Sequence, residues 1–190
     1  MFKRIIKGDF GYLQKKRKRV IILTIIYFLI SISIFAIGYI TTGTKRNLLT
    51  VVAVLGCLPA CKSMVSMIMF IRAKGCPKEK ADIILLHCDK LISMFDMYFT
   101  SYSSNFNILH MVVLDSVIIG FYDDVKFDEQ KAVEHLKTML KNDGYNVNAV
   151  TLTSDMDKYL GMLDNFNSKE SSSAGDKDDA IRITLYQISL

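Results

Sequence analysis

Two long apolar runs constrain this 190-residue chain more than any other feature. Residues 20–40 contain no charged side chain, and residues 48–71 contain one, Lys62. At about 1.5 Å of rise per residue, either run is long enough as a helix to cross the roughly 30 Å hydrocarbon core of a bilayer. Lipid offers backbone amides no partners, so both runs are expected to be helical. The sequence therefore predicts a transmembrane hairpin over residues 20–71, with spans at 20–40 and 48–71.

The distribution of charge predicts how this hairpin is oriented. Residues 1–19 carry eight basic side chains and one acidic one, and residues 72–80 carry four and one. From residue 81 onward there are nine basic and 17 acidic side chains, a net charge of −8. Basic flanks stay on the cytoplasmic side of a membrane. We therefore expect a multi-pass protein of the cell membrane with both termini cytoplasmic, a basic juxtamembrane segment at 1–19 and an acidic cytosolic domain at 77–190.

A basic run directly precedes the first span and consists of Lys15, Lys16, Arg17, Lys18 and Arg19. Lysine and arginine near a membrane surface gain about 1 kcal/mol each from anionic headgroups. The run is therefore predicted to contact anionic lipid, although its role in fixing the topology would need no specific lipid. Because it abuts a span, we do not expect a nucleic acid partner.

The second span contains two features that bear on function. A charge near the middle of a membrane costs about 2.5–3.5 kcal/mol. Lys62 therefore extends toward the interface, lies beyond a span that ends near Cys61, or serves as a binding residue. Small residues recur at intervals of three and four positions, which allows close approach between helices: Ala53, Gly56, Ala60 and Ser63. This stripe predicts tight packing within the hairpin, a homo-oligomer or a protein partner in the membrane.

The remainder of the chain alternates between helix-like and strand-like patterns. We expect a helix over 79–96, strands over 98–102, 106–114 and 117–122, a helix after Asp128, a fourth strand over 147–153 and a helix after Ser154 or Asp155. The polar residues 168–179 are predicted to form a mobile loop. Residues 181–190 fit either a helix or a strand. The predicted fold class is α+β, with the soluble order α-β-β-β-α-β-α and a mixed sheet.

This order of elements over residues 79–153 resembles the restriction-endonuclease-like fold and its membrane-associated nuclease-related relatives. The resemblance implies an acidic residue near the second strand and an acidic-x-Lys triplet on the third, which together hold a divalent metal ion and assist attack. Asp115 ends the expected second strand, but residues 117–122 contain neither an acid nor a lysine. The sequence thus departs from the pattern at the position that carries the chemistry.

Few other residues are candidates for a functional site. Asp123 and Asp124 form an acidic cluster after the third strand, and together with Lys62 and Asp115 they are the candidate binding residues. His110 lies on a strand expected to be buried, where a hydrogen-bonded core histidine is the predicted role. The chain has no phosphate-binding loop, nucleophile elbow or metal motif, so we expect no catalytic residue, no metal and no cofactor.

The preferred hypothesis from the sequence is a two-pass membrane protein whose cytosolic domain acts by binding, as a scaffold, an accessory subunit or a sensor. One alternative is a membrane-anchored enzyme with a diverged nuclease-like domain. A pocket that gathers Asp115, Asp123, Asp124 and a lysine would favour that alternative. A second alternative is an oligomeric channel or transporter component that uses Lys62.

Overall fold

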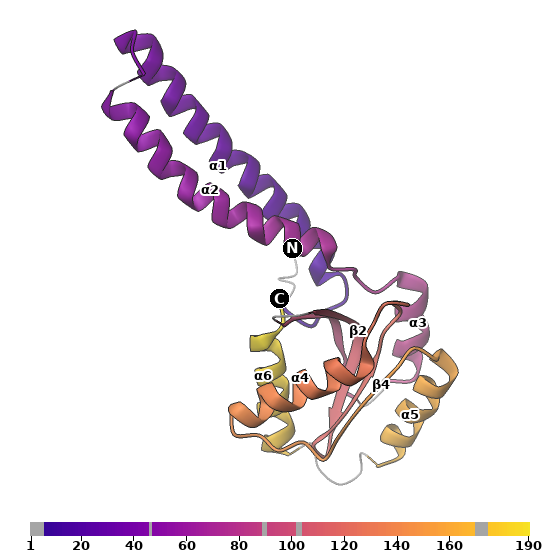
Figure 1. Cartoon of the computed structure of the whole chain (residues 1–190). Helices are drawn as coiled ribbons and strands as arrows, with labels where there is room; N and C mark the ends of the chain where they lie inside the picture. Colours follow the sequence, from indigo (N-terminus) through magenta and orange to yellow (C-terminus); the bar gives the residue numbers. More distant parts are fainter. Residues whose placement is uncertain (1–5, 46, 89–90, 102–103, 170–174) are drawn as a thin grey trace. The chain divides into compact units, whose positions relative to one another are not determined.

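The chain forms two compact units, one comprising residues 13–73 and the other residues 1–12 together with 74–190 (Figure 1). A computed structural model describes residues 6–45, 47–88, 91–101, 104–169 and 175–190. The first unit is a pair of long apolar helices. The second is a mixed α+β domain built on a four-stranded sheet.

The helix pair consists of α1, Tyr12–Thr42, and α2, Leu48–Arg72. Asn47 caps α2 by accepting a hydrogen bond from the Thr50 N–H, 2.8 Å away, and its side-chain amide donates to the Gly38 carbonyl of α1 at 2.9 Å. Deeper in the pair, the hydroxyls of Thr24 and Ser63 share a buried hydrogen bond of 2.7 Å. Polar contacts therefore link the two helices both at the turn and within the apolar stretch.

The sheet has the strand order β1-β2-β3-β4. Its strands are β1, Met94–Thr100, β2, Asn105–Leu114, β3, Val117–Phe121, and β4, Ala149–Thr153. β2 is antiparallel to both of its neighbours, whereas β4 is parallel to β3. The sequence prediction of a mixed sheet is therefore confirmed.

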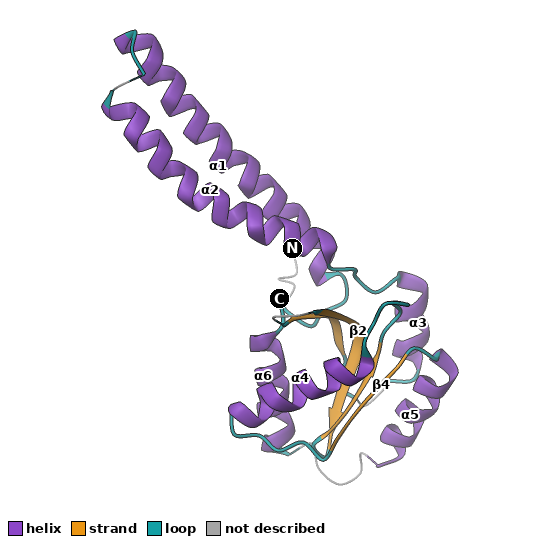
Figure 2. Ribbon diagram, viewed as in Figure 1, coloured by secondary structure: helices purple, strands orange, loops and turns teal. Residues whose placement is uncertain are grey.

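Four helices cover the two faces of this sheet. α4, Glu129–Asn142, and α6, Asp176–Ile188, contribute to one core, whereas α3, Lys78–Leu86, and α5, Met156–Lys169, contribute to the other (Figure 2). Both faces of β2 are consequently buried. This explains why its sequence is almost continuously apolar rather than alternating.

The alternation of side chains changes phase in the middle of β1 and β2. The same core contains positions 94, 97 and 99 of β1 and positions 106, 108, 111 and 113 of β2. The side chains that face it are two residues apart except between 94 and 97 and between 108 and 111, where they are three apart. These two intervals lie opposite each other in the paired strands. Asp96 has φ +58° at this level and its side chain accepts a hydrogen bond from the Cys76 N–H, 2.7 Å away. The phase change turns His110 toward α5, where it contacts Tyr159.

The outer edge of β1 is covered by segments from both ends of the described chain. The Phe95 N–H donates to the Gly8 carbonyl at 2.7 Å, and the Leu190 N–H donates to the Tyr98 carbonyl at 2.8 Å. The Lys7 ammonium group donates to the carbonyls of the last turn of α6 and its cap, at 2.7 and 2.5 Å. Residues near both termini thus act as a cover for the sheet edge.

Two expectations from the sequence differ from the structure. The helix predicted over 79–96 ends at Leu86, and residues 94–96 belong to β1. Positions 84, 88, 91 and 95 are nevertheless buried in one core. Their helix-like spacing therefore reflects the burial of residues on α3, on the segment after it and on β1. α1 begins at Tyr12 rather than Val20, so the predicted basic segment 1–19 is divided between the two units.

The C-terminal region also differs from the prediction. Residues 176–179, expected in a mobile loop over 168–179, form the first turn of α6, while residues 170–174 of that loop lie outside the described residues. Residues 181–188, which fitted either structure, are helical. Ser189 then makes a single bridge to Phe99, so the last residues do reach the sheet.

Candidate functional site

Lys62 lies on the exposed surface of the helix pair. Its backbone carbonyl accepts a hydrogen bond from Ser66, but its ammonium group has no partner among the described residues. The hydroxyl of the neighbouring Ser63 shares a hydrogen bond with the Thr24 hydroxyl. Ser31 and Ser33 lie on α1 and carry oxygen atoms that a lysine could contact. The Ser33 hydroxyl donates a hydrogen bond to the Leu29 carbonyl.

The five basic residues at the start of α1 differ in their exposure and in their hydrogen bonds. The Arg17 guanidinium donates to the carbonyls of Phe70 and Ala73 at 2.9 and 2.5 Å, and so it caps the C-terminal end of α2. Lys15, Lys18 and Arg19 are exposed and Lys16 is half-buried. Four of the five predicted headgroup contacts therefore have side chains at the surface, whereas Arg17 has a structural task within the pair.

The predicted acidic residues are not brought together. Asp115 lies in the turn before β3, whereas Asp123 and Asp124 follow its other end, and five residues of extended strand span roughly 17 Å. Asp123 forms an ion pair with Lys80 of α3, and Asp124 accepts a hydrogen bond from the Lys126 N–H. Within the described residues, no three His, Cys, Asp or Glu side chains are grouped so that they could hold a metal ion.

A different carboxylate organises the turn that contains Asp115. Asp178 of α6 is 3% exposed and accepts hydrogen bonds from the Asp115 and Ser116 N–H groups at 2.8 and 2.9 Å. Both turn residues have positive φ, +51° and +59°, which is the geometry of a tight hairpin turn of type I′. Asp178 therefore holds a turn whose sequence lacks the glycine that usually permits it.

His110 is fully buried between the sheet and α5, as the sequence predicted for a core histidine. Its Nδ1 atom shares a 2.6 Å hydrogen bond with the Tyr159 hydroxyl, and its ring packs at 4.4 Å from that of Phe95. Its Nε2 atom has no partner among the described residues. Because burial disfavours the charged ring, it lowers the pKa of His110 to about 3.

The same core contains a second perturbed group, Cys76, on the segment that leads into α3. Burial and the nearby carboxylate of Asp96 raise the pKa of the Cys76 thiol to about 12. A thiol in this state is a poor nucleophile, since the thiolate is the reactive form. Cys76 and His110 are both buried in the core of the sheet domain.

A groove of about 470 Å³ lies between α4 and β4 in the sheet domain, and we call it the α4–β4 groove. It is lined by six residues of α4 and one of β4: Glu129, Gln130, Val133, Glu134, Lys137, Thr138 and Val150. α4 is fixed at its start by Asp128, which accepts a hydrogen bond from the Lys131 N–H at 3.1 Å and pairs with its ammonium group at 2.8 Å. The groove therefore lies beside the capped first turn of α4.

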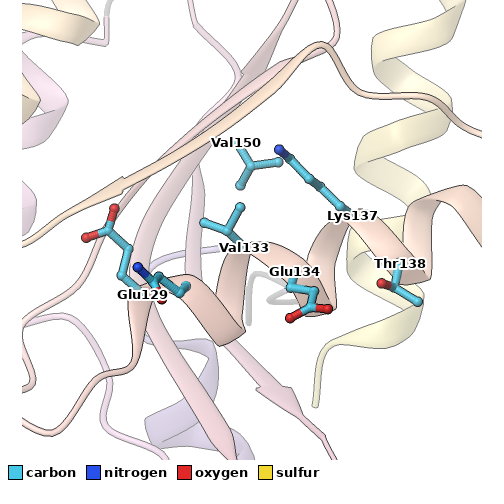
Figure 3. A pocket seen from close by; sticks show the side chains of 7 residues that line it. Glu129, Val133, Glu134, Lys137, Thr138 and Val150 are labelled. Carbon is cyan, nitrogen blue, oxygen red and sulfur yellow. The ribbon is translucent and has the colours of Figure 1, made fainter.

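Charges of opposite sign stand at the two ends of the α4–β4 groove (Figure 3). Val133 points toward Val150 and forms an apolar centre, the ammonium group of Lys137 reaches toward the strand at one end, and the carboxylate of Glu129 does so at the other. Glu134 points away from the strand. The groove therefore combines an apolar centre with charged side chains on either side of it.

Sequence reasoning missed this groove, since α4 presents it on the polar side of an ordinary amphipathic helix. One signal was available: residues 149–153 contain no charge and no proline, which is unusual for a strand at the edge of a sheet. That signal is useful only when the strand order is known. In comparisons with protein families, with curated proteins and with solved structures, the chain matched none.

Proposed function

We propose that the protein is a two-pass membrane protein whose sheet domain lies on the cytoplasmic side and acts by binding another protein. The observation that carries the membrane assignment is the apolar surface of the helix pair. Only 11% and 17% of the most apolar stretches of α1 and α2 are buried, whereas a core helix of a soluble protein would be mostly buried. Ile40 and Leu48, for example, are each 79% exposed.

Exposed apolar area of this extent is unfavourable in water, at about 25 cal/mol per Å², and favourable in lipid. The cationic side chains at the start of α1 and the end of α2 supply the charge asymmetry that keeps these ends in the cytoplasm. Lys15, Lys16, Lys18 and Arg19 are free to contact anionic headgroups in this arrangement, whereas Arg17 is engaged by α2.

The membrane assignment is tested by fractionation and protease protection. We expect the full chain to remain in membranes after an alkaline wash, and an external protease to leave residues beyond 73 intact in sealed cells. Recovery of the intact chain from the soluble fraction without detergent would overturn the assignment. Digestion of the sheet domain from outside would overturn the orientation alone.

The binding assignment is supported by the α4–β4 groove, which combines an apolar centre with charged ends. Crosslinking in intact membranes tests it. We expect a crosslinker on Thr138, which lines the groove, to capture a protein, and the same crosslinker on the exposed Lys141 to capture far less. Equal capture at both positions, or none at either, would remove the support for this surface.

A second candidate, a membrane-anchored enzyme with a diverged nuclease-like domain, is favoured by one observation. The described elements from α3 to β4 follow the order α-β-β-β-α-β on which the resemblance rests. Nuclease activity with Mg²⁺ or Mn²⁺ that is lost on substitution of Asp115 or Asp123 would establish this candidate. Activity unchanged by both substitutions would assign it to a contaminant.

A further inference from the structure

The two edge strands of the sheet, β1 and β4, differ in whether another segment covers their outer edge. The edge of β1 is covered by Gly8 and Leu190, whereas β4 pairs with β3 alone within the described part of the chain. A strand at an open edge presents unpaired N–H and C=O groups, and natural sheets usually protect such edges with charge, proline or a covering segment. β4 has the sequence Ala-Val-Thr-Leu-Thr and carries neither charge nor proline.

The α4–β4 groove lies where the side chains of an added strand would fall. A strand that extends a sheet gains main-chain hydrogen bonds from the edge, and its alternate side chains enter pockets beside it. Val133 and Val150 offer an apolar floor for such side chains (Figure 3). The open edge and the groove are thus two parts of one surface.

The charges of this surface are self-complementary. Glu129 and Lys137 are eight residues apart on α4, about 12 Å along a helix, and they lie on either side of the apolar centre. A two-fold axis through that centre would place Glu129 of each copy next to Lys137 of the other. Such an axis also runs two β4 strands antiparallel to each other, the arrangement that an isologous dimer requires.

We propose that the occupant of the α4–β4 groove is a second copy of this chain, paired through β4 so that the two sheets become continuous. This inference rests on the proposed function and names its partner. Ion pairs between Glu129 and Lys137 of the two copies set the register, while the backbone of β4 and the apolar centre supply most of the affinity. Two copies confined to one membrane meet at a high effective concentration, which favours this pairing.

Charge reversal tests the proposal in the full chain. Glu129→Lys and Lys137→Glu each place like charges opposite one another twice in a symmetric dimer. We expect either variant to self-associate about tenfold more weakly than the wild type, equivalent to about 1.4 kcal/mol. An equimolar mixture of the two variants restores both pairs and should associate as tightly as the wild type, as should the double variant Glu129→Lys/Lys137→Glu.

The measurement is energy transfer between labelled copies reconstituted in vesicles at several protein-to-lipid ratios. Lys141→Glu and Asp143→Lys are matched controls, since they make the same changes of charge at exposed positions outside the groove. Restoration in the mixture also excludes misfolding of the single variants. A monomeric wild type, single variants that associate like the wild type, or a mixture that stays dissociated each overturn the proposal. A chain that still fractionates with membranes in those cases leaves the membrane assignment intact.

Discussion

The buried histidine makes the stability of the sheet domain depend on pH in a calculable way. His110 has a pKa of about 3 in the folded chain and about 6.5 in the unfolded chain, so the unfolded state binds more protons between these values. Stability is therefore fully present above pH 6.5 and is lost as the pH falls toward 3. Integrating this difference from pH 7.5 to pH 5 gives a loss of about 2 kcal/mol from this one group.

A double variant isolates that contribution. His110→Leu alone would leave the Tyr159 hydroxyl buried without its partner, whereas His110→Leu/Tyr159→Phe removes both halves of the 2.6 Å hydrogen bond. The other histidines, His87 and His135, remain in both proteins, so their effects cancel in the comparison. We expect the wild type to lose about 2 kcal/mol more than the double variant between pH 7.5 and pH 5.

The assay is chemical unfolding of the full chain in neutral detergent. Unfolding is monitored by hydrogen exchange of the β2 and β3 amides, so that the helix pair does not contribute to the measured free energy. Both proteins are measured at each pH in the same buffer series. Stability curves for the two proteins that run parallel within about 0.5 kcal/mol would refute the reasoning, since a buried neutral histidine must produce a slope of this sign.

Further substitutions test three other parts of the structure. Asp178→Ala should destabilise the sheet domain by about 3 kcal/mol, because two turn N–H groups lose a charged acceptor. Ser116→Gly should stabilise the turn by about 1 kcal/mol, because position 116 has a positive φ. Hydrogen exchange at the β2–β3 hairpin measures both effects. Arg17→Gln should weaken the helix pair by about 1–2 kcal/mol in a detergent titration while Lys18→Gln, with the same change of charge, should not; equal effects would show that charge rather than capping matters. Lys62→Leu should leave ion flux through reconstituted vesicles unchanged, and abolition of a measurable flux would favour the channel alternative.

Much of the fold could be predicted from local pattern. The strand over 106–114 and the hairpin that follows were recognisable because an apolar run was bounded by Asp115 and Ser116. The helix after Asp128 was recognisable because its cap and its buried stripe are adjacent in the sequence. In each case the physical cause acts over fewer than about 15 residues, so no knowledge of distant contacts was needed.

The errors arose where burial rather than periodicity determined the residue type. Ile84, Cys88, Leu91 and Phe95 are buried in one core although they lie on α3, on the segment after it and on β1, and their spacing imitates a helix. The functional candidates were chosen by residue type and therefore included Asp115 and Asp123, which β3 holds apart. The α4–β4 groove depends on strand order, which no local pattern encodes.

The cover on the edge of β1 has a consequence for biogenesis. Gly8 and Leu190 both bond to β1, and Lys7 bonds to the Tyr186 and Ser189 carbonyls, about 180 positions away. These hydrogen bonds cannot form until residues 186–190 have left the ribosome. By then both apolar helices have long since emerged and have been available to the insertion machinery. In the proposed membrane arrangement, integration of the helix pair can therefore precede completion of the sheet.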